Sequence, residues 1–587
     1  MVAIHYSALN HAEREIRLLT VQSGSTKDRI DCSLTHVSLT NHPTYSALSY
    51  VWGNPEERVP ITVEGAVVLV TKKLWIALRS LRSGTGDLIV WVDAVCIDQT
   101  DVPERNEQVA MMGDIYASAT SVLIWIGEAD DTSDVAFDLM PGIMNRAVDL
   151  RAHSEAGSFY FGLSGRPWFN RVWIMQELAL ATDDPIVICG SQRVCWTTFV
   201  GAWQVVAKEM FSEMGQVRYL GRQADTDNVE VLAKIKLDLL KDLRRHVRGM
   251  GGGSLRQLLI FSRTSEASKA EDRIYALLAM LRKDDRASIA IDYRKPIAVV
   301  YAEAMAHIFS IGDGPDFLSG MWLSDPGCQI SDLPSWVPDF SSQAAEKATV
   351  PNSVAFRPPY PRTVSGPGAD AANGVVHPDM KTLEIRALHV DIVQGVLLFD
   401  QSIDGCIRQL PEVEAMAARA MERELSVTDE QQPFYENYRR SEPLWRTLVS
   451  NKRRGSGYDV APMSYEAAFR AILSSAKEGE HTPPSLGDED PALPVSEYRQ
   501  TLQEHLPCRT FFTTRNGLVG VGMPGVRAGD QVTIWFGAPV PFIVRECEDD
   551  DTYKLVGAAY VAGIMEGQMV DELYCEDLAD AITLLVK

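Results

Sequence analysis

The segment LIVWVDAVCIDQTDVPERNEQV, Leu88 to Val109, begins with five apolar residues and then turns abruptly polar. An uninterrupted apolar run of this length is typical of a strand that is buried on both faces of a sheet. Asp93 follows the run at once, with Asp98 and Gln99 soon after. Because open α/β sheets form their ligand sites at the carboxyl ends of strands, the segment predicts a buried parallel strand with a polar site at its end.

Strand-like and helix-like patterns alternate on both sides of this segment. Further strand-like runs start at Glu15, Ala47 and Ser121, and helical periodicity covers 71–82 and 100–119. Strands that alternate with helices are typical of a parallel sheet covered by helices on both faces. We therefore expect an α/β fold whose parallel sheet is flanked by helices, then a mainly helical region and a small β-rich domain at the C-terminal end.

The length of 587 residues predicts several domains, because one hydrophobic core rarely serves more than about 250–300 residues. Pro-rich and Gly-rich stretches and changes of periodicity indicate where the boundaries fall. We divide the chain into an α/β domain at 1–200 with its core at about 45–180, a helical region at 201–340, a linker or insertion at 341–376, a mixed and helical region at 377–500 with a mobile segment at 476–494, and a β-rich domain at 501–587.

The composition excludes several classes of partner. A formal net charge of -23 opposes binding to nucleic acid, since phosphate recognition requires a concentrated basic surface. Nine cysteines without a CxxC pair or a Cys/His spacing typical of metal ligands predict reduced thiols and no metal site. No apolar run has the length of a signal peptide core or a membrane span, so we expect a cytoplasmic protein.

Three sequence blocks together resemble a known family. They are TYSALSYVWGNP at 44–55, VWVDAVCIDQTDVPERNEQVAMMGDIYASATSVLIWIGEA at 90–129, and RPWFNRVWIMQELAL at 166–180. In this order and at this spacing they resemble the hallmark blocks of the fungal heterokaryon-incompatibility (HET) domain. Later stretches, such as LPSWVPDF from Leu333, are similar to the accessory regions of larger members of that family.

The resemblance implies a fungal protein of nonself recognition whose activation triggers growth arrest or cell death. It also implies an N-terminal domain similar to the Toll/interleukin-1 receptor (TIR) domain, with a flavodoxin-like sheet. The implied partners are a second copy of the chain or an incompatibility partner protein. A small-molecule ligand is a further candidate.

Three residues near the predicted strand end are candidates for catalysis: Asp93, Cys96 and Glu107. Cys96 could act as a nucleophile if a neighbouring helix N-terminus lowers its pKa, or it could be a buried apolar residue. Glu107 could serve as a catalytic or ribose-binding carboxylate, as a glutamate is thought to do in some TIR-like hydrolases. Alternatively, Glu104 and Glu107 complement the dipole of their helix.

The candidates for ligand binding are aromatic, charged or amide side chains in the same blocks. Arg171 could contact a ligand or form a buried ion pair with Asp93 or Glu177. The tryptophans of the third block could stack on a base or pack inside the protein. The candidate ligand-binding residues are Tyr50, Trp52, Gly53, Asp98, Gln99, Arg105, Trp168, Arg171 and Glu177, and Tyr45 and Ser49 raise the same question.

Three functions remain open from the sequence alone. The first is a regulatory HET-domain protein that acts by assembly with itself or with a partner. The second is an enzyme that cleaves NAD or another nucleotide through a carboxylate, or performs acyl or hydrolytic chemistry through Cys96. A pathway of specialised metabolism could recruit such an enzyme. The third is a structural scaffold without chemistry at the sheet. No cofactor is certain, and NAD is the candidate substrate of the second function.

Overall fold

The chain forms two compact units, each described by itself. Unit 1 comprises 1–216 and 225–295, and unit 2 comprises 217–224 and 296–587. Residues 342–373 of the expected linker and 479–491 of the expected mobile segment lie outside the described part of the chain. The computed structural model describes residues 4, 6–25, 28–145, 162–212, 229–283, 285, 289–320, 330–341, 374–453, 460–478, 492–548, 551–573 and 581–587.

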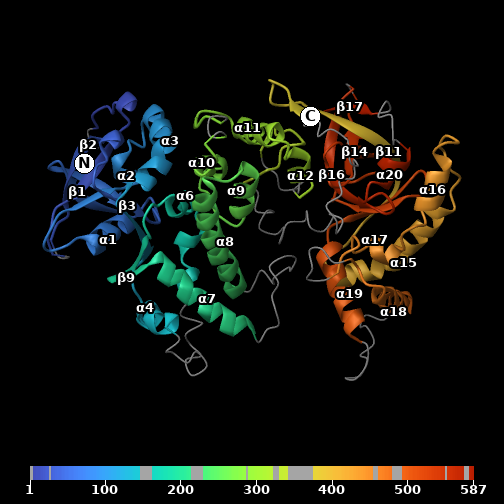
Figure 1. The fold of residues 1–587 in the computed structure, drawn as a ribbon, viewed down its shortest axis with the longest axis horizontal. Coiled ribbons are helices and arrows are strands. Elements are labelled where there is room, and N and C mark those ends of the chain that lie inside the picture. Colours follow the sequence, from blue (N-terminus) through green and yellow to red (C-terminus); the bar gives the residue numbers. More distant parts are fainter. Residues whose placement is uncertain are drawn as a thin grey trace. The chain divides into compact units, whose positions relative to one another are not determined.

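A mixed sheet forms the centre of unit 1 (Figure 1). Among the described residues it has nine strands in the order β5-β4-β2-β1-β6-β3-β7-β8-β9. This confirms the expected α/β class, with antiparallel strands added at both sides of a parallel core. The strands are β1 (Glu15–Val21), β2 (Asp31–Ser38), β3 (Ser46–Ser49), β4 (Arg58–Val63), β5 (Ala66–Thr71), β6 (Leu88–Trp91), β7 (Ser121–Gly127), β8 (Ile186–Cys189) and β9 (Gln192–Cys195).

The four neighbouring strands β6, β3, β7 and β8 pair in parallel. In chain order their arrangement is 2-1-3-4, the start of the flavodoxin-like order. The connection from β3 to β6 and the connection from β6 to β7 run in opposite directions, so right-handed crossovers place them on opposite faces. The carboxyl ends of β3 and β7 therefore border a topological switch point, where α/β sheets form crevices.

Local sequence explains the two main helices next to this core, α1 (Lys72–Leu81) and α3 (Val102–Ser118). The Thr71 side chain caps α1 by accepting a hydrogen bond from the Leu74 amide, and the Asp101 side chain caps α3 through the Glu104 amide. The apolar residues at helical spacing on both are buried as predicted. The other helices of unit 1 are η1 (His11–Glu13), η2 (Leu39–Asn41), α2 (Asp93–Cys96), α4 (Asp131–Met144), η3 (Pro167–Asn170), α6 (Ile174–Ala179), α7 (Trp196–Ser212), α8 (Val229–Met250), α9 (Leu255–Phe261) and α10 (Asp272–Leu278).

A buried ion pair fixes the loop that follows β6. Arg17 on β1 donates to both oxygens of Glu104 on α3, at 2.5 and 2.8 Å, and the Arg17 side chain is 1% exposed. Arg17 also donates to the carbonyl of Cys96, while Glu104 accepts from the amide of Asp98. The pair thus connects the edge of the parallel core, the loop after α2 and the start of α3.

Unit 2 contains a closed β-barrel. The long strand β11 pairs with β12 through its second half and with β14 through its first half, so the ring β11-β12-β13-β16-β15-β14 returns to β11. Strand β11 lies in the region 377–500 that we interpreted as mixed and helical. The strands are β10 (Val375–Val376), β11 (Leu383–Leu398), β12 (Thr510–Thr514), β13 (Val519–Gly522), β14 (Gln531–Trp535), β15 (Phe542–Glu546), β16 (Tyr553–Val561) and β17 (Ile582–Val586).

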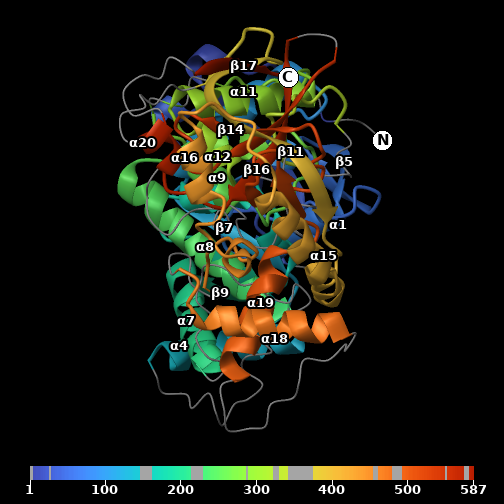
Figure 2. The same cartoon turned by 90° about the vertical axis from the view of Figure 1, so that its right-hand side faces the viewer.

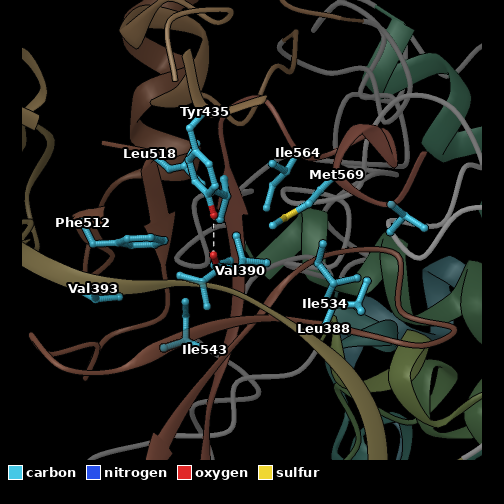
Figure 3. Close-up of a cluster of buried hydrophobic side chains, with 14 of the residues drawn as sticks. Leu388, Val390, Val393, Tyr435, Phe512, Leu518, Ile534, Ile543, Ile564 and Met569 are labelled. Carbon is cyan, nitrogen blue, oxygen red and sulfur yellow. Dashed lines mark hydrogen bonds between the residues drawn. The ribbon is translucent and has the colours of Figure 1, made fainter. Parts of the chain in front are cut away.

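Helices complete unit 2, and α16 contributes to its core. The Tyr435 hydroxyl of α16 donates to the Val390 carbonyl of β11 at 2.6 Å, among apolar side chains from the barrel and α20 (Figure 3). Helix α18 packs against both α15 and α19 (Figure 2), and α15 also contacts β12. The helices are α11 (Ile297–Ser310), α12 (Gly314–Leu318), α15 (Ile403–Met421), α16 (Gln432–Tyr438), α17 (Leu444–Thr447), α18 (Ser464–Glu478), α19 (Ala492–His505) and α20 (Gln568–Leu573).

The structure bears on two expectations from the sequence, the helical region at 201–340 and the lack of a membrane span. The helical region predicted at 201–340 is divided between the units, since α7 to α10 belong to unit 1 and α11 and α12 to unit 2. Within the described ranges, no helix combines the length and the apolar character required to cross a bilayer.

The Arg17–Glu104 pair generates a prediction about stability. Glu104→Gln leaves the buried guanidinium of Arg17 without its counter-charge, so we expect a loss of about 3–5 kcal/mol in the free energy of unfolding of unit 1. The measurement is urea unfolding followed by a probe in unit 1. The matched control is Asp114→Asn, which breaks the exposed Arg14–Asp114 pair and should change stability little. Equal effects of the two variants would contradict the role given to the buried pair.

Candidate functional site

Five polar residues from three segments converge at the carboxyl ends of β3 and β6. Ser49 is the last residue of β3 and Tyr50 follows it, while Asp93 starts α2 directly after β6. Arg171 follows η3, and Glu177 lies in α6. We call these residues the β3/β6 cluster. Its position is the strand end predicted from the sequence, at the side of the switch point.

Ser49 of β3 connects two residues of the third sequence block, Trp168 and Glu177. The indole nitrogen of Trp168 donates to the Ser49 hydroxyl at 2.8 Å, and this hydroxyl in turn donates to the Glu177 carboxylate. Trp168 is fully buried and its ring packs edge-on against Phe169. Trp168 therefore supports the cluster from the interior through its hydrogen bond to Ser49.

Hydrogen bonds from Trp52, Ala94 and Gln99 hold Asp93 in place. Its carboxylate accepts from the indole nitrogen of Trp52 at 2.8 Å and from the Ala94 amide at 2.8 Å. Its carbonyl accepts from the side-chain amide of Gln99 at 2.9 Å. Burial raises the pKa of Asp93, although the charge of Arg171 and the Trp52 hydrogen bond act in the opposite direction.

Glu177 is the most deeply buried acid of the cluster. Burial raises its pKa to about 7, although the positive charge of Arg171 and the Ser49 hydrogen bond lower it. The negative charge of Asp93 adds to the increase. The Arg171 guanidinium itself donates to the carbonyl of Tyr50. At neutral pH the cluster thus holds a carboxyl group that can both give and accept a proton.

The Tyr50 hydroxyl has no hydrogen-bond partner among the described residues, although the side chain is only 2% exposed. Burial is the main cause of its strongly raised pKa; the charges of Asp93 and Glu177 raise it further, while the positive charge of Arg171 lowers it. These influences place the hydroxyl in the electrostatic field of the cluster. A buried hydroxyl without a partner costs free energy, so folding leaves Tyr50 as an unsatisfied polar group inside the cluster.

Two of the three catalytic candidates lie apart from the cluster. Cys96 is fully buried, its sulfur accepts from the Val92 amide at 3.4 Å, and burial raises its thiol pKa to about 12. A thiol nucleophile requires the opposite shift, so the structure supports the interpretation of Cys96 as a buried apolar residue. Glu107 is exposed on α3, one turn beyond Glu104, which is the acid in the first turn of the helix.

Other candidates build the loop between α2 and α3. The Asp98 carboxylate accepts from the amide and the hydroxyl of Thr100, at 2.9 and 2.7 Å, and so fixes a turn. The guanidinium of Arg105 lies over the Tyr293 ring at 4.5 Å. Together with Gln99, whose side chain reaches Asp93, these residues shape the surroundings of the cluster.

The backbone conformation at position 53 requires a glycine. Its φ of +74° lies in the left-handed region, and a Cβ there would lie 2.5 Å from the Cγ of Lys73. Only glycine fits this turn without strain. Gly53 therefore acts by letting the chain turn after Trp52.

Sequence reasoning missed two residues that stabilise the structure around the site. Tyr116 of α3 donates to the Leu48 carbonyl at 3.0 Å and packs edge-on against Trp91. The helical periodicity at 100–119 is consistent with a buried Tyr116, but nothing in a periodic pattern reveals a hydrogen bond. Arg17 was missed because its partner Glu104 is 87 positions away.

The chemistry of the cluster is that of acids and hydrogen bonds. In the described part of the chain, no group of three or more His, Cys, Asp and Glu side chains is arranged to hold a metal ion. Two carboxyl groups, a guanidinium and a free hydroxyl can bind a polar ligand and transfer protons to it.

Comparisons with known proteins agree with the two units. Residues 45–177 match the family model of the heterokaryon incompatibility protein (HET), and residues 488–578 match that of the Het-6 β-barrel domain. The chain is 24% identical to "Heterokaryon incompatibility protein 6, OR allele" of Neurospora crassa, over 97% of this chain and 96% of that protein. No solved structure matches the chain. The first match contains every residue of the β3/β6 cluster.

The raised pKa of Glu177 predicts a dependence of stability on pH. The folded protein binds the proton more tightly than the unfolded chain, so this contribution to stability is complete at low pH and is lost as pH rises from about 4.5 to about 7. Glu177→Gln cannot ionise, so we expect it to gain roughly 1–3 kcal/mol relative to the wild type over this range. Urea unfolding at a series of pH values measures the difference, and parallel curves would contradict the pKa assigned to Glu177.

The burial of Cys96 predicts its reactivity. Cys195 is exposed, so iodoacetamide should modify it in the native protein at about pH 8 and should leave Cys96 unmodified. Peptide mass spectrometry before and after denaturation measures both sites. Fast modification of Cys96 in the native state would contradict its burial and would make it a candidate nucleophile again.

Proposed function

We propose that this chain acts in heterokaryon incompatibility and that its activation causes growth arrest or cell death, because it matches the HET and Het-6 β-barrel family models and is similar to a heterokaryon incompatibility protein of Neurospora crassa. The observation that carries the proposal is that the segment matching the HET family model, 45–177, contains every residue of the β3/β6 cluster. The similarity along nearly the whole length of the Neurospora crassa protein supports it.

We propose that the β3/β6 cluster is the functional centre of the domain. Folding leaves Tyr50 with a buried free hydroxyl and Glu177 with a carboxyl pKa of about 7. Both features cost stability, and such costs are typical of functional sites. The cluster binds a small polar ligand, and the bound state favours self-association or contact with a partner protein in the cytoplasm, in the manner of a TIR-like domain.

An enzymatic form of this function is favoured by one observation: the charge of Arg171 acts on two carboxyl groups, the buried Glu177 and the half-buried Asp93. In this alternative the domain hydrolyses NAD. Water adds to the ribose carbon that carries nicotinamide, the glycosidic bond breaks, nicotinamide leaves with its electron pair, and the proton of water passes to solvent. Asp93 or Glu177 would supply the carboxylate, in place of the exposed Glu107 and the buried Cys96.

The incompatibility proposal predicts a loss of response in a charge variant. Expression of the full chain in a filamentous fungal host should arrest growth, and Glu177→Gln should abolish the arrest at equal protein abundance because it removes the titrating carboxyl group. Glu107→Gln makes the same chemical change on the exposed side of α3 and should leave the arrest intact. Full activity of Glu177→Gln, or no arrest by the wild type, would contradict the proposal.

The same variants test the enzymatic alternative. Purified full-length protein is incubated with NAD, and released nicotinamide is measured by chromatography. Release that is lost in Glu177→Gln or Asp93→Asn and kept in Glu107→Gln assigns the chemistry to the cluster. Growth arrest without nicotinamide release rejects the enzyme and keeps the regulatory function.

A further inference from the structure

A small cavity in unit 2 lies where the segment before and after α17 meets the turn that follows β16. Its volume is about 40 Å³, which is room for roughly three water-sized spheres. Four of its polar residues are half-buried, so it is partly open to solvent. The lining residues are Glu442, Asn451, Tyr560, Gly563, Met565, Glu566 and Gln568.

Hydrogen-bond acceptors dominate this cavity. The Tyr560 hydroxyl donates to the two oxygens of Glu442, at 2.8 and 2.9 Å, and so uses its only proton. The side-chain oxygen of Gln568 accepts from the Glu566 amide at 2.8 Å. The side-chain oxygen of Asn451 is buried and has no partner among the described residues. The cavity therefore holds several acceptor oxygens, of which Asn451 Oδ1 lacks a donor.

The backbone holds these acceptors in place. Asn451 has a φ of +54°, its amide donates to the Arg446 carbonyl at 2.9 Å, and its carbonyl accepts from the Ala461 amide at 3.1 Å. Gly563 has a φ of +85°, and a Cβ there would lie 2.6 Å from the Tyr438 carbonyl oxygen. Both walls of the cavity are therefore built on constrained turns, which fixes the acceptors before any ligand arrives.

The charges around the cavity favour a cation. Glu442 and Glu566 are acidic, Tyr560 is neutral, and Arg446 is the positive group whose field reaches Glu442. Burial raises the pKa of Glu442 to about 7, although the Tyr560 hydrogen bond and the Arg446 charge lower it. Removal of Glu442 from water is thus only partly compensated by its neighbours, and a bound cation would complete the compensation.

We propose that this cavity binds a primary ammonium group, supplied by a free alkylamine or by the tip of a lysine side chain of another protein. An ammonium has three N–H donors, and they match Asn451 Oδ1, the Glu442 carboxylate and the Glu566 carboxylate. The volume admits the nitrogen with one or two carbons and excludes the wider guanidinium. The inference is independent of the function proposed for unit 1.

Met565 provides a probe inside the cavity. The full chain is labelled with ¹³C at its methionine methyl groups, and the Met565 signal is assigned with Met565→Leu. Ethylammonium should shift this signal in a saturable manner, whereas potassium and tetramethylammonium should not. A Met565 signal that does not move, or that moves equally with potassium, would overturn the proposal and leave a cavity that holds only water.

Variants test the acceptors one at a time. Glu442→Gln keeps an acceptor for Tyr560 and removes the charge, so it should weaken ethylammonium binding at least about tenfold. Asn451→Leu removes the free oxygen and should weaken binding as well. Glu412→Gln, on the exposed face of α15, is the matched control and should bind as the wild type does. Unchanged binding in both cavity variants would overturn the site.

Two further measurements complete the test. Binding of ethylammonium should strengthen from about pH 6 to about pH 8, because Glu442 ionises over this range while the amine stays charged. Nα-acetyl-lysine methylamide that binds as well as ethylammonium indicates a lysine of a protein as the natural source. Preference for the free amine indicates a small molecule. Binding that weakens over this pH range would overturn the role of Glu442.

Discussion

The burial of acidic groups at the carboxyl ends of β3 and β6 is the constraint on which the account of unit 1 depends. A carboxyl group removed from water keeps its proton unless charges and hydrogen bonds replace the lost hydration. Arg171 and Ser49 replace that hydration only in part at Glu177, so its pKa reaches about 7. The same burial leaves the Tyr50 hydroxyl without a partner. A structure selected for stability alone would avoid both costs, and these costs are the reason for proposing the cluster as a functional centre.

The fold makes this cluster possible by fixing the loop after β6. Arg17 and Glu104 connect β1, the Cys96 carbonyl and the Asp98 amide, and Gln99 then reaches back to Asp93. The order 2-1-3-4 of the parallel strands puts a topological switch point between β3 and β7. The antiparallel strands extend the sheet on both sides of this core. Unit 2 carries its own acceptor-rich cavity around Glu442, on a barrel closed by β11.

Short-range patterns predicted much of this architecture, and long-range contacts limited the rest. The apolar run from Leu88, the faces of α1 and α3, and the position of Asp93 depend on neighbours in sequence, and the structure places them as expected. The environments of Cys96 and Glu107 were harder to predict, because a difference of one helical turn decides whether a side chain is buried or exposed. The mixed character of the sheet and the closure of the barrel by β11 depend on pairing between distant strands, which periodicity does not contain.

Tyrosine hydroxyls offer the most direct test of the cluster as a functional centre. Tyr50→Phe removes a buried hydroxyl without a partner, whereas Tyr116→Phe removes one that donates to the Leu48 carbonyl. The measurement is growth arrest in a fungal host together with the melting temperature of each purified variant. The account predicts that Tyr50→Phe loses the arrest with its melting temperature intact, and that Tyr116→Phe is less stable but still arrests growth. Full arrest by Tyr50→Phe would contradict it.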